Sequence, residues 1–312
     1  FKQKTAYEIY QCDWSSDVCS SDLNFDNCLV IMLEDSEKHK NLQSVNYCYE
    51  QLLAKNYPRQ SLILAFGGGV IGDMAGFVAA TYMRGVPFIQ IPTTLLACID
   101  SSIGGKTAVD MPAGKNLVGA FYNPCAVIID ENLLKTLPTK EYNAAMAEVI
   151  KHALIFDDIF FNDLLTKDLN LHNIIIRSLN IKKYLVEKDF HENHVRCYLN
   201  FGHTFAHALE KVSNYQLRHG EAVAIGMMME TKLALYLGIL KEDFTKELKA
   251  VLNKFNLDSN YPLVITDLIN ALAYDKKNDL DKIGFALPIK KGQMQKCLVE
   301  QKDILDFLAT LS

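Results

Sequence analysis

The sequence lacks the features that mark secreted, membrane-spanning and nucleic-acid-binding proteins. None of its eight cysteines stands in a CxxC pair, and it contains a single tryptophan. No apolar run reaches the length of about eighteen residues that crosses a bilayer, and the first residues lack the basic-then-apolar pattern of a secretion signal. With 32 basic and 37 acidic residues, the chain has no positive excess for nucleic acid or an anionic membrane. We therefore expect a soluble cytoplasmic protein with reduced thiols that binds neither nucleic acid nor membrane.

The order of apolar segments predicts two domains. The 312 residues, 49% of them hydrophobic, are enough for two cores of ordinary size. Short apolar runs typical of buried strands alternate with helical periods as far as Asp130, and long helical periods follow Pro138. We therefore expect an α/β domain over residues 24–137 and an all-α domain over residues 138–312.

Residues 1–23 differ in composition from the rest of the chain. The segment from Gln11 to Leu23 is rich in Ser and Asp and shows no helical or strand period. We interpret residues 1–23 as foreign sequence joined to the chain or, alternatively, as a disordered polar tail.

A glycine turn lies between an apolar strand and a helix. Ser61–Phe66 reads as a buried strand, and Gly67, Gly69 and Gly72 then match G-x-G-x-x-G before a helix of small residues. Residues without Cβ let backbone N–H groups approach a diphosphate at the positive end of a helix. The acidic residue expected about twenty positions later is missing, because Phe88–Pro92 is another apolar run. The pattern predicts a nucleotide site, but not one of the standard Rossmann type.

A polar loop follows that run and carries Asp100, Lys106, Lys115 and Asn116. Its Gly-Gly-Lys-Thr lacks the earlier glycine of a Walker A loop, so a nucleotide triphosphate loop is excluded. Single lysines on loops are usually solvated, whereas cations and amides clustered in this way suit a phosphate or carboxylate group.

The stretch from Asn200 to Glu221 has the composition of a metal site. On a helix, His203 and His207 would project from one face, and His219 follows at the start of the next apolar helix. Glu148 and Lys151 stand three apart on an earlier helix, where they read either as a surface salt bridge or as the source of a carboxylate ligand. The alternative is a set of ordinary, partly buried histidines.

Taken together, these motifs resemble the 3-dehydroquinate synthase family. The resemblance runs from about Glu34 to the C-terminus, and the eight motifs occur in the family's order. They are Gly67–Asp73, Met83–Val86, Pro92–Ala97, Asp100–Asp110, Gly114–Asn116, Ala147–Lys151, Asn200–Thr204 and His219–Glu221.

The resemblance implies a Rossmann-like NAD-binding α/β domain followed by a metal-binding helical domain. It also implies a reaction of the shikimate pathway of aromatic amino acid biosynthesis. A phosphorylated sugar acid, 3-deoxy-D-arabino-heptulosonate 7-phosphate, is converted to 3-dehydroquinate and phosphate by this lyase. The steps are transient oxidation by NAD, β-elimination of phosphate, re-reduction and an intramolecular aldol closure. Zinc or cobalt is the implied metal, and a homodimer is the implied assembly.

The resemblance assigns residues to three groups. The metal ligands correspond to Glu148, His203 and His219, which makes His207 a group facing the substrate phosphate and not a ligand. The substrate and catalytic residues correspond to Asp100, Lys106, Asn116, Lys151, Lys182, Arg196, Asn200, His207, Lys276, Lys277 and Arg84. The cofactor contacts correspond to Glu37, Lys40, Gly68, Gly69, Val70, Asp73, Thr93, Thr94, Lys115 and Thr136.

Within the substrate group, the resemblance implies distinct roles. Asp100 and Lys151 meet reacting hydroxyls, whereas Lys182 and Arg196 hold the substrate carboxylate. Arg84 would reach in from the neighbouring subunit. The implied phosphate pocket is Lys106, Asn116, Asn200, His207 and one of Lys276 and Lys277. Ser36 replaces a glycine that the family has one position before Glu37.

Three other interpretations stay open at this point. One is a sugar phosphate cyclase with a different substrate, and another is a metal-dependent alcohol dehydrogenase. The third is an inactive chain, because residues 1–23 do not match the family's opening strand-helix-strand unit. On that ground we expect zinc binding with only weak NAD binding.

Overall fold

The computed structural model describes residues 6–11, 28–34, 36–258, 265–273 and 282–311. The chain divides into two compact units, Phe1–Pro138 and Thr139–Ser312. This division falls where the sequence changes from short apolar runs to long helical periods. In the described part of the chain, no helix is both long enough and apolar enough to span a membrane.

The first unit is built on a parallel sheet of five strands in the order β2-β1-β3-β4-β7. Parallel strands covered by helices are expected to be continuous apolar runs, as β3 and β4 are. The strands are β1 (Ala6–Gln11), β2 (Leu29–Leu33), β3 (Leu62–Gly67), β4 (Phe88–Pro92) and β7 (Ala126–Val127). A separate antiparallel hairpin pairs β5 (Lys106–Met111) with β6 (Gly114–Phe121).

Strand β1 corrects the interpretation of residues 1–23. The sequence analysis placed that whole segment outside the fold, whereas Ala6–Gln11 is a strand paired on both sides, with β2 and with β3. Its sequence, AYEIYQ, contains two tyrosines and an isoleucine, which favour strands. The Ser- and Asp-rich residues 12–23 lie outside the described residues.

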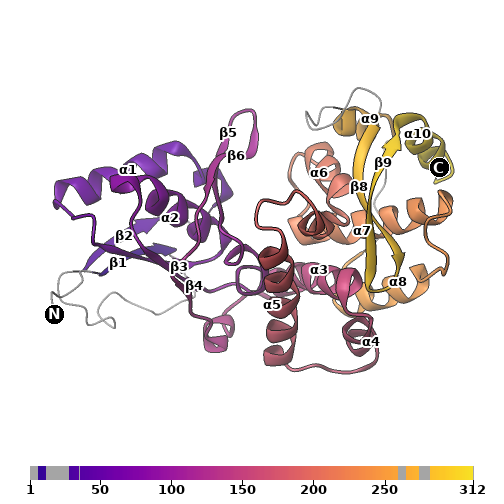
Figure 1. The fold of residues 1–312 in the computed structure, drawn as a ribbon, viewed down its shortest axis with the longest axis horizontal. Helices are drawn as coiled ribbons and strands as arrows, with labels where there is room; N and C mark the ends of the chain where they lie inside the picture. The colour runs from indigo at the N-terminus through magenta and orange to yellow at the C-terminus, as the bar shows by residue number, and fades with distance from the viewer. Residues whose placement is uncertain (1–5, 12–27, 35, 259–264, 274–281, 312) are drawn as a thin grey trace. The chain divides into compact units, whose positions relative to one another are not determined.

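Helices α1 (Leu42–Ala54) and α2 (Gly69–Thr81) lie on the same face of this sheet (Figure 1). The Asn41 side chain caps α1 by accepting the backbone N–H of Ser44. Helix α2 consists largely of small and apolar residues because it packs closely on its surroundings. A Cβ on Gly76 would lie 2.4 Å from Cγ2 of Thr107 on β5. The described part of the unit also contains the short helical segments η2 to η5, which are Glu37–His39, Tyr82–Arg84, Ala97–Ser101 and Glu131–Leu134.

The second unit is mainly helical. Its central helix, α7, is buried on nearly every side from Gly220 to Ala234 and contacts α3 and α6. A helix that is apolar all round belongs in a core. The helices are α3 (Thr139–Phe156), α4 (Asp158–Thr166), α5 (Leu171–Lys188), η6 (Val195–Asn200), α6 (His203–Val212), α7 (His219–Tyr236), α8 (Thr245–Lys254), α9 (Ile265–Ala273) and α10 (Gln301–Ala309).

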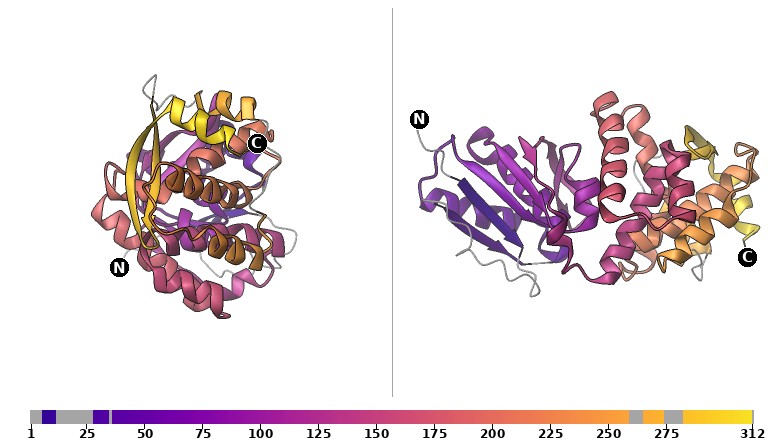
Figure 2. Two further views of the ribbon diagram at one scale, coloured as in Figure 1. Left: turned by 90° about the vertical axis from the view of Figure 1, so that its right-hand side faces the viewer. Right: turned by 90° about the horizontal axis from the view of Figure 1, so that it is seen from below.

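The prediction of an all-α second unit is wrong for residues 282–300. Strands β8 (Lys282–Lys290) and β9 (Gln293–Glu300) form an antiparallel hairpin. Figures 1 and 2 show it lying across the helices, and it contacts α7 and α3. The alternation of Ile283, Phe285 and Leu287 and the left-handed Gly292 at the turn, with φ of 76°, explain why these residues pair as strands.

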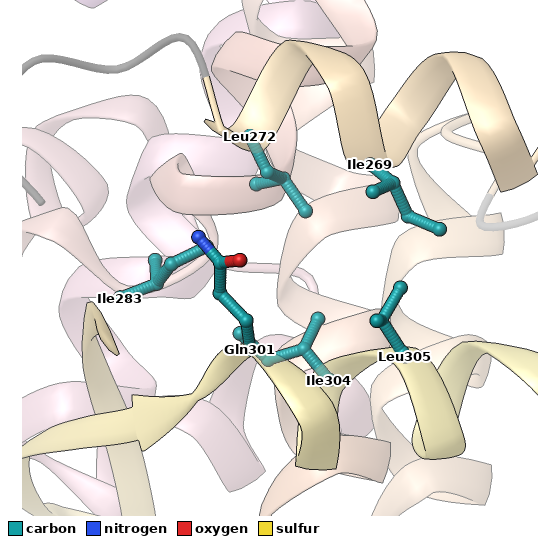
Figure 3. A pocket seen from close by; sticks show the side chains of 6 residues that line it. All are labelled: Ile269, Leu272, Ile283, Gln301, Ile304 and Leu305. Atoms are coloured by element: carbon teal, nitrogen blue, oxygen red, sulfur yellow. The ribbon is translucent and has the colours of Figure 1, made fainter. Parts of the chain in front are cut away.

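An apolar pocket lies between α9, β8 and α10 (Figure 3). It is lined by Ile269, Leu272, Ile283, Gln301, Ile304 and Leu305. Gln301 supplies its one polar side chain. No residue that the sequence analysis assigned to a site lines this pocket, so we regard it as a feature of core packing between these three elements.

Candidate functional site

Three side chains from three helices converge in the second unit. Glu148 comes from the middle of α3, while His203 and His219 are the first residues of α6 and α7. The Oε1 atom of Glu148 lies 3.5 Å from Nε2 of His203 and 3.3 Å from Nε2 of His219. One ligand atom from each residue lies within 4.8 Å of the other two. Two imidazole nitrogens and one carboxylate form a donor set typical of catalytic zinc sites with an open position.

His207 lies beside this group without being part of it. Its ring centroid is 5.5 Å from that of His203, and the two rings meet edge to face. Helical spacing alone predicts that these two histidines form a ligand pair, because it places them on one face of a helix. The convergent donors in the second unit are instead Glu148, His203 and His219, the set that the family resemblance implies.

Two glycines on α7 set the distances between the three helices. A Cβ on Gly220 would lie 1.9 Å from the carbonyl oxygen of Ala144, one turn before Glu148 on α3. A Cβ on Gly226 would lie 1.9 Å from the carbonyl oxygen of Gly202, directly before His203. Backbone atoms of neighbouring helices occupy the space of these missing side chains. Helix α7 therefore brings the elements that carry the candidate ligands together.

Burial and neighbouring charges determine the protonation of these donors. Glu148 is 1% exposed and pairs with Lys151, which is 2% exposed. Burial and the nearby Lys151 ammonium hold the pKa of His203 well below its usual value, so its imidazole is neutral. Burial also acts to lower the pKa of His219, but hydrogen bonds to Glu148 and Glu210 raise it to about 9. A metal ion binds neutral imidazole, so His219 must lose its proton when an ion is bound.

Two buried carboxylates support these helices. Glu210 on α6 accepts from Nδ1 of His219 at 3.1 Å. Glu230 on α7 accepts backbone N–H groups at the start of α6. The sequence analysis assigned no role to Glu230, although a glutamate that follows eight apolar or small residues, Ala222–Met229, in a core helix is an available signal.

Two of the residues that the resemblance assigned to the substrate are buried cations of the second unit. Arg196 is 1% exposed and Lys182 is 5% exposed. The Nη1 group of Arg196 donates to the carbonyl of Phe190 at 2.5 Å. Asn200 is exposed and donates to Glu192 at 2.6 Å. Lys276 and Lys277 lie outside the described residues.

Asp189 organises the loop that carries Arg196. Its carboxylate accepts the backbone N–H groups of Asn193, His194 and Arg196 at 2.9, 2.6 and 3.1 Å. These bonds lower the pKa of Asp189, although burial opposes them. The Arg196 guanidinium is thereby held at a fixed point on the loop.

The resemblance implies that Arg196 holds the substrate carboxylate, and on that basis we expect Asp189→Ala to raise the KM for the substrate on the order of tenfold, because the loop loses three acceptor contacts. Zinc affinity should stay unchanged, since the candidate ligands lie on other elements. Steady-state kinetics and a zinc titration measure the two effects. Glu187→Ala, which removes an exposed ion pair with Lys183, is the control. Equal KM values for the two variants would contradict the role of Asp189.

In the first unit, residues assigned to the cofactor gather around Lys40. This ammonium is 4% exposed and donates to Asp73 Oδ2 and Asn116 Oδ1, both at 2.6 Å. Lys115 lies 4.0 Å from Glu37. Burial acts to lower the pKa of Lys40, but the Asp73 carboxylate overcomes this and raises it. The resemblance placed Asn116 in the phosphate pocket. In the structure, Asn116 lies instead among four residues that the resemblance assigned to the cofactor.

The remaining cofactor candidates cluster at the ends of β3 and β4. Gly68, Gly69 and Val70 open α2, and Gly67 before them has φ of 156°. The backbone N–H of Thr93 donates to the carbonyl of Gly67 at 3.0 Å, which joins the two strand ends. Thr94 follows directly, and its Oγ1 accepts from the N–H of Ala97. Thr136 lies farther along the chain, after η5.

The last three assigned residues lie at separate points of the first unit. Asp100 is half-buried in η4, and Lys106 is exposed at the start of β5. Arg84 is exposed, and both it and Met83 have positive φ, 65° and 49°. Two consecutive non-glycine residues in the left-handed region are costly, and such strain is concentrated at functional positions.

Two family models together match residues 30–278 of the chain. Residues 30–144 match the model described as "3-dehydroquinate synthase N-terminal", and residues 145–278 match "3-dehydroquinate synthase C-terminal". A curated relative from Alkaliphilus metalliredigens, named 3-dehydroquinate synthase, is 43% identical over 290 residues. The alignment covers 90% of this chain and 82% of that relative.

Two solved structures resemble the whole chain. A 2-deoxy-scyllo-inosose synthase in complex with carbaglucose-6-phosphate, NAD+ and Co2+ has a TM-score of 0.85 and 27% identity, covering 97% of this chain and 90% of that one. A 2-epi-5-epi-valiolone synthase from Streptomyces hygroscopicus, with NAD+ and Zn2+ bound, has a TM-score of 0.83 and 28% identity. That match covers 91% of this chain and 82% of the other.

Proposed function

The chain belongs to the 3-dehydroquinate synthase family and catalyses that enzyme's step of the shikimate pathway, and we propose that it does so with NAD and a divalent metal held by the residues described above. The observation that carries this proposal is the convergence of Glu148, His203 and His219 in the second unit. The proposed substrate is 3-deoxy-D-arabino-heptulosonate 7-phosphate.

Glu148, His203 and His219 fit a zinc or cobalt ion by their chemistry. They offer one anionic oxygen and two imidazole nitrogens, and a three-residue set leaves positions for substrate oxygens. When bound there, the metal would polarise a substrate hydroxyl and make its proton more acidic. The two solved structures support this choice of ions, because one holds Co2+ and the other Zn2+.

The first unit fits NAD. Glycines at the end of β3 allow a diphosphate to approach the start of α2, where the helix dipole favours negative charge. The polar group of Glu37, Lys40, Asp73 and Lys115 would bind the cofactor's hydroxyls and phosphates. Gly72 lets α2 pack tightly on β4, since a Cβ there would lie 2.6 Å from Oε1 of Gln90. When bound, NAD would supply a hydride acceptor for transient oxidation of the substrate alcohol and a hydride donor for its later reduction.

The remaining residues bind and orient the substrate. Arg196 and Lys182 are buried cations suited to its carboxylate, and Arg196 can bind it through two parallel N–H bonds. His207 and Asn200 supply donors for the phosphate. Lys151 would donate from Nζ to a reacting hydroxyl, and Asp100 would accept from one. By holding that alcohol, these residues would orient the substrate for its oxidation, which would acidify the adjacent C–H and allow β-elimination of phosphate before re-reduction and ring closure.

Lys40→Met is expected to weaken NAD binding by about 10- to 100-fold. The change removes the ammonium that joins Asp73 to Asn116, and a hydrogen bond to a charged group is worth roughly 1.5–3 kcal/mol. Fluorescence titration with NADH measures the affinity directly. Lys38→Met, at an exposed position two residues earlier, is the control. Equal affinity in both variants would remove Lys40 from the cofactor site.

One assay tests the proposed reaction. The purified chain is supplied with Zn2+, NAD and the heptulosonate phosphate, and released phosphate is measured together with NADH. We expect many turnovers of phosphate release and no net accumulation of NADH. Stoichiometric NADH would indicate an alcohol dehydrogenase. Turnover with a hexose phosphate in place of the heptulosonate would indicate another cyclase of this superfamily.

A homodimer is also part of the proposal. Arg84 is exposed and sits in strained backbone at the end of α2, as a residue held for contact with a second molecule would be. Sedimentation of the wild-type chain tests the assembly, because the proposal requires a dimer. The rate of phosphate release tests Arg84, because the Arg84→Ala variant should be less active than the wild type.

A further inference from the structure

Helices α6 and α7 are joined by two carboxylates in a reciprocal arrangement. Each helix begins with a candidate metal ligand, His203 in α6 and His219 in α7, and each carries a buried glutamate farther along. The glutamate of α6, Glu210, contacts the first residue of α7. The glutamate of α7, Glu230, contacts the first turn of α6.

Glu230 supplies hydrogen-bond acceptors for backbone N–H groups at the start of α6. The first turn of a helix has N–H groups without acceptors inside the helix, and Gly202 at the cap position has no side chain to offer. The Oε2 atom of Glu230 accepts from the N–H of Gly202 at 2.8 Å, and Oε1 accepts from the N–H of Thr204 at 3.1 Å. These two residues flank His203, so the contact fixes the backbone that carries this ligand.

Glu210 acts on the side chain of the other ligand. Its Oε1 accepts from Nδ1 of His219 at 3.1 Å, while Nε2 of the same ring faces Glu148 at 3.3 Å. A carboxylate on one ring nitrogen determines which nitrogen is offered to a metal and fixes the plane of the ring. Glu210 is 5% exposed, so its contact with His219 is shielded from water.

The position of Glu230 argues against a purely structural role. It is fully buried in the apolar helix that forms the core of the unit, and burial raises the pKa of its carboxyl to about 8 although the backbone bonds oppose this. An apolar residue of similar size would avoid the cost of burying a polar group whose oxygens need partners. The glutamate instead links the two helices that hold two of the three ligands.

We propose that Glu210 and Glu230 form a reciprocal brace that holds His203 and His219 in their metal-binding positions. They are positioning residues, because they touch the ligands' helices and rings and not the substrate. The inference rests on the proposed metal site. Because each contact fixes the same relative position of α6 and α7, the effects of losing both are expected to overlap.

Zinc affinity of the full chain tests the brace. The variants are Glu230→Gln, which sets an NH2 group against one of the two N–H donors, and Glu210→Met, which keeps the length but cannot accept. Each is expected to weaken zinc binding by about 10- to 100-fold, as losses of outer-sphere partners typically do. In the double variant, the loss of zinc affinity should be smaller than the product of the two single losses, by a factor of about two or more. The matched control is Thr231→Val at the next residue of α7, whose buried hydroxyl donates to the carbonyl of Met227 one turn earlier in the same helix.

Competition against a chromophoric chelator gives the affinities, and the visible spectrum of the Co2+-loaded protein reports the ligand geometry. A merely structural loss would lower the melting temperature, as in Thr231→Val, with the Co2+ spectrum unchanged. The proposal of a brace would be overturned if Glu230→Gln and Glu210→Met bind zinc as tightly as Thr231→Val does. It would also be overturned if the two losses of affinity multiply fully in the double variant. If Glu230→Gln does not fold, as judged by circular dichroism, Glu210→Met decides alone. A wild-type chain without zinc affinity would instead overturn the metal site itself.

Discussion

Alanine in place of His219 is expected to abolish tight zinc binding and to lower kcat by about 100- to 1,000-fold. The Nε2 atom of His219 lies 3.3 Å from Glu148 and is one of three convergent donors, so its loss leaves two ligands. A catalytic metal contributes several kcal/mol of charge stabilisation, and each 1.36 kcal/mol corresponds to a factor of about ten in rate. Metal content after dialysis and the rate of phosphate release measure the two effects.

The choice of control separates ligand loss from loss of a histidine. His172→Ala removes an exposed imidazole from α5 in the same unit, and His172 is not one of the three convergent donors. It should keep both zinc and activity. A chelator should inactivate the wild type reversibly, with recovery on addition of Zn2+ or Co2+. Retention of stoichiometric zinc by His219→Ala would remove this residue from the ligand set and with it the proposed centre.

The candidate ligands could be found from the sequence, but their arrangement could not. Spacing alone favoured His203 with His207, because residues four apart share a face of one helix. In the structure His203 meets Glu148 and His219, which lie on two other helices. Such convergence depends on how α3, α6 and α7 pack, and helical periodicity carries no information about it. The motif resemblance pointed to the three side chains that converge in the structure, because it carries information about packing that spacing lacks.

The fold was predictable to the extent that a local pattern determined it. Two local patterns correspond to features of the structure. The glycine turn joins β3 to α2, and the change from short apolar runs to long helical periods at Pro138 marks the boundary between the two units. The hairpin of residues 282–300 was missed although Ile283, Phe285 and Leu287 alternate, because a short apolar run resembles a buried helix segment. Strand β1 was missed because the Ser-rich residues after it dominated the composition.

Glu230 shows where a local signal exists but has no interpretation without coordinates. A glutamate in a helix that is apolar on every side must find a partner, and the sequence states only that one is needed. Its partners, the N–H groups of Gly202 and Thr204, lie 28 and 26 positions earlier on another helix. Nearly every residue has a backbone N–H, so the sequence does not show which of them will donate to Glu230. The contact follows only from the packing of α6 on α7.

Alanine at Gly220 or Gly226 is expected to disrupt the metal centre by displacing α7. In either variant the new Cβ would lie 1.9 Å from a backbone carbonyl oxygen, of Ala144 or of Gly202. Neither oxygen can turn aside as a side chain would, so the helices must separate. Overpacking costs about 1–3 kcal/mol or more and outweighs the gain of up to about 1 kcal/mol in helix propensity. The melting temperature should fall by roughly 2–12 °C.

Zinc affinity distinguishes this displacement from simple destabilisation. Moving α7 away from α3 separates His219 from Glu148, and moving it from α6 separates His219 from His203, so both variants should bind zinc more weakly even where they remain folded. Gly284→Ala is the matched control, since its Cβ would meet its nearest neighbour, Leu298, at an ordinary 3.9 Å. The prediction fails if Gly220→Ala and Gly226→Ala melt at lower temperature yet bind zinc as tightly as Gly284→Ala. In that case the close approach of the helices would serve packing alone, and the positions of the ligands would tolerate the shift.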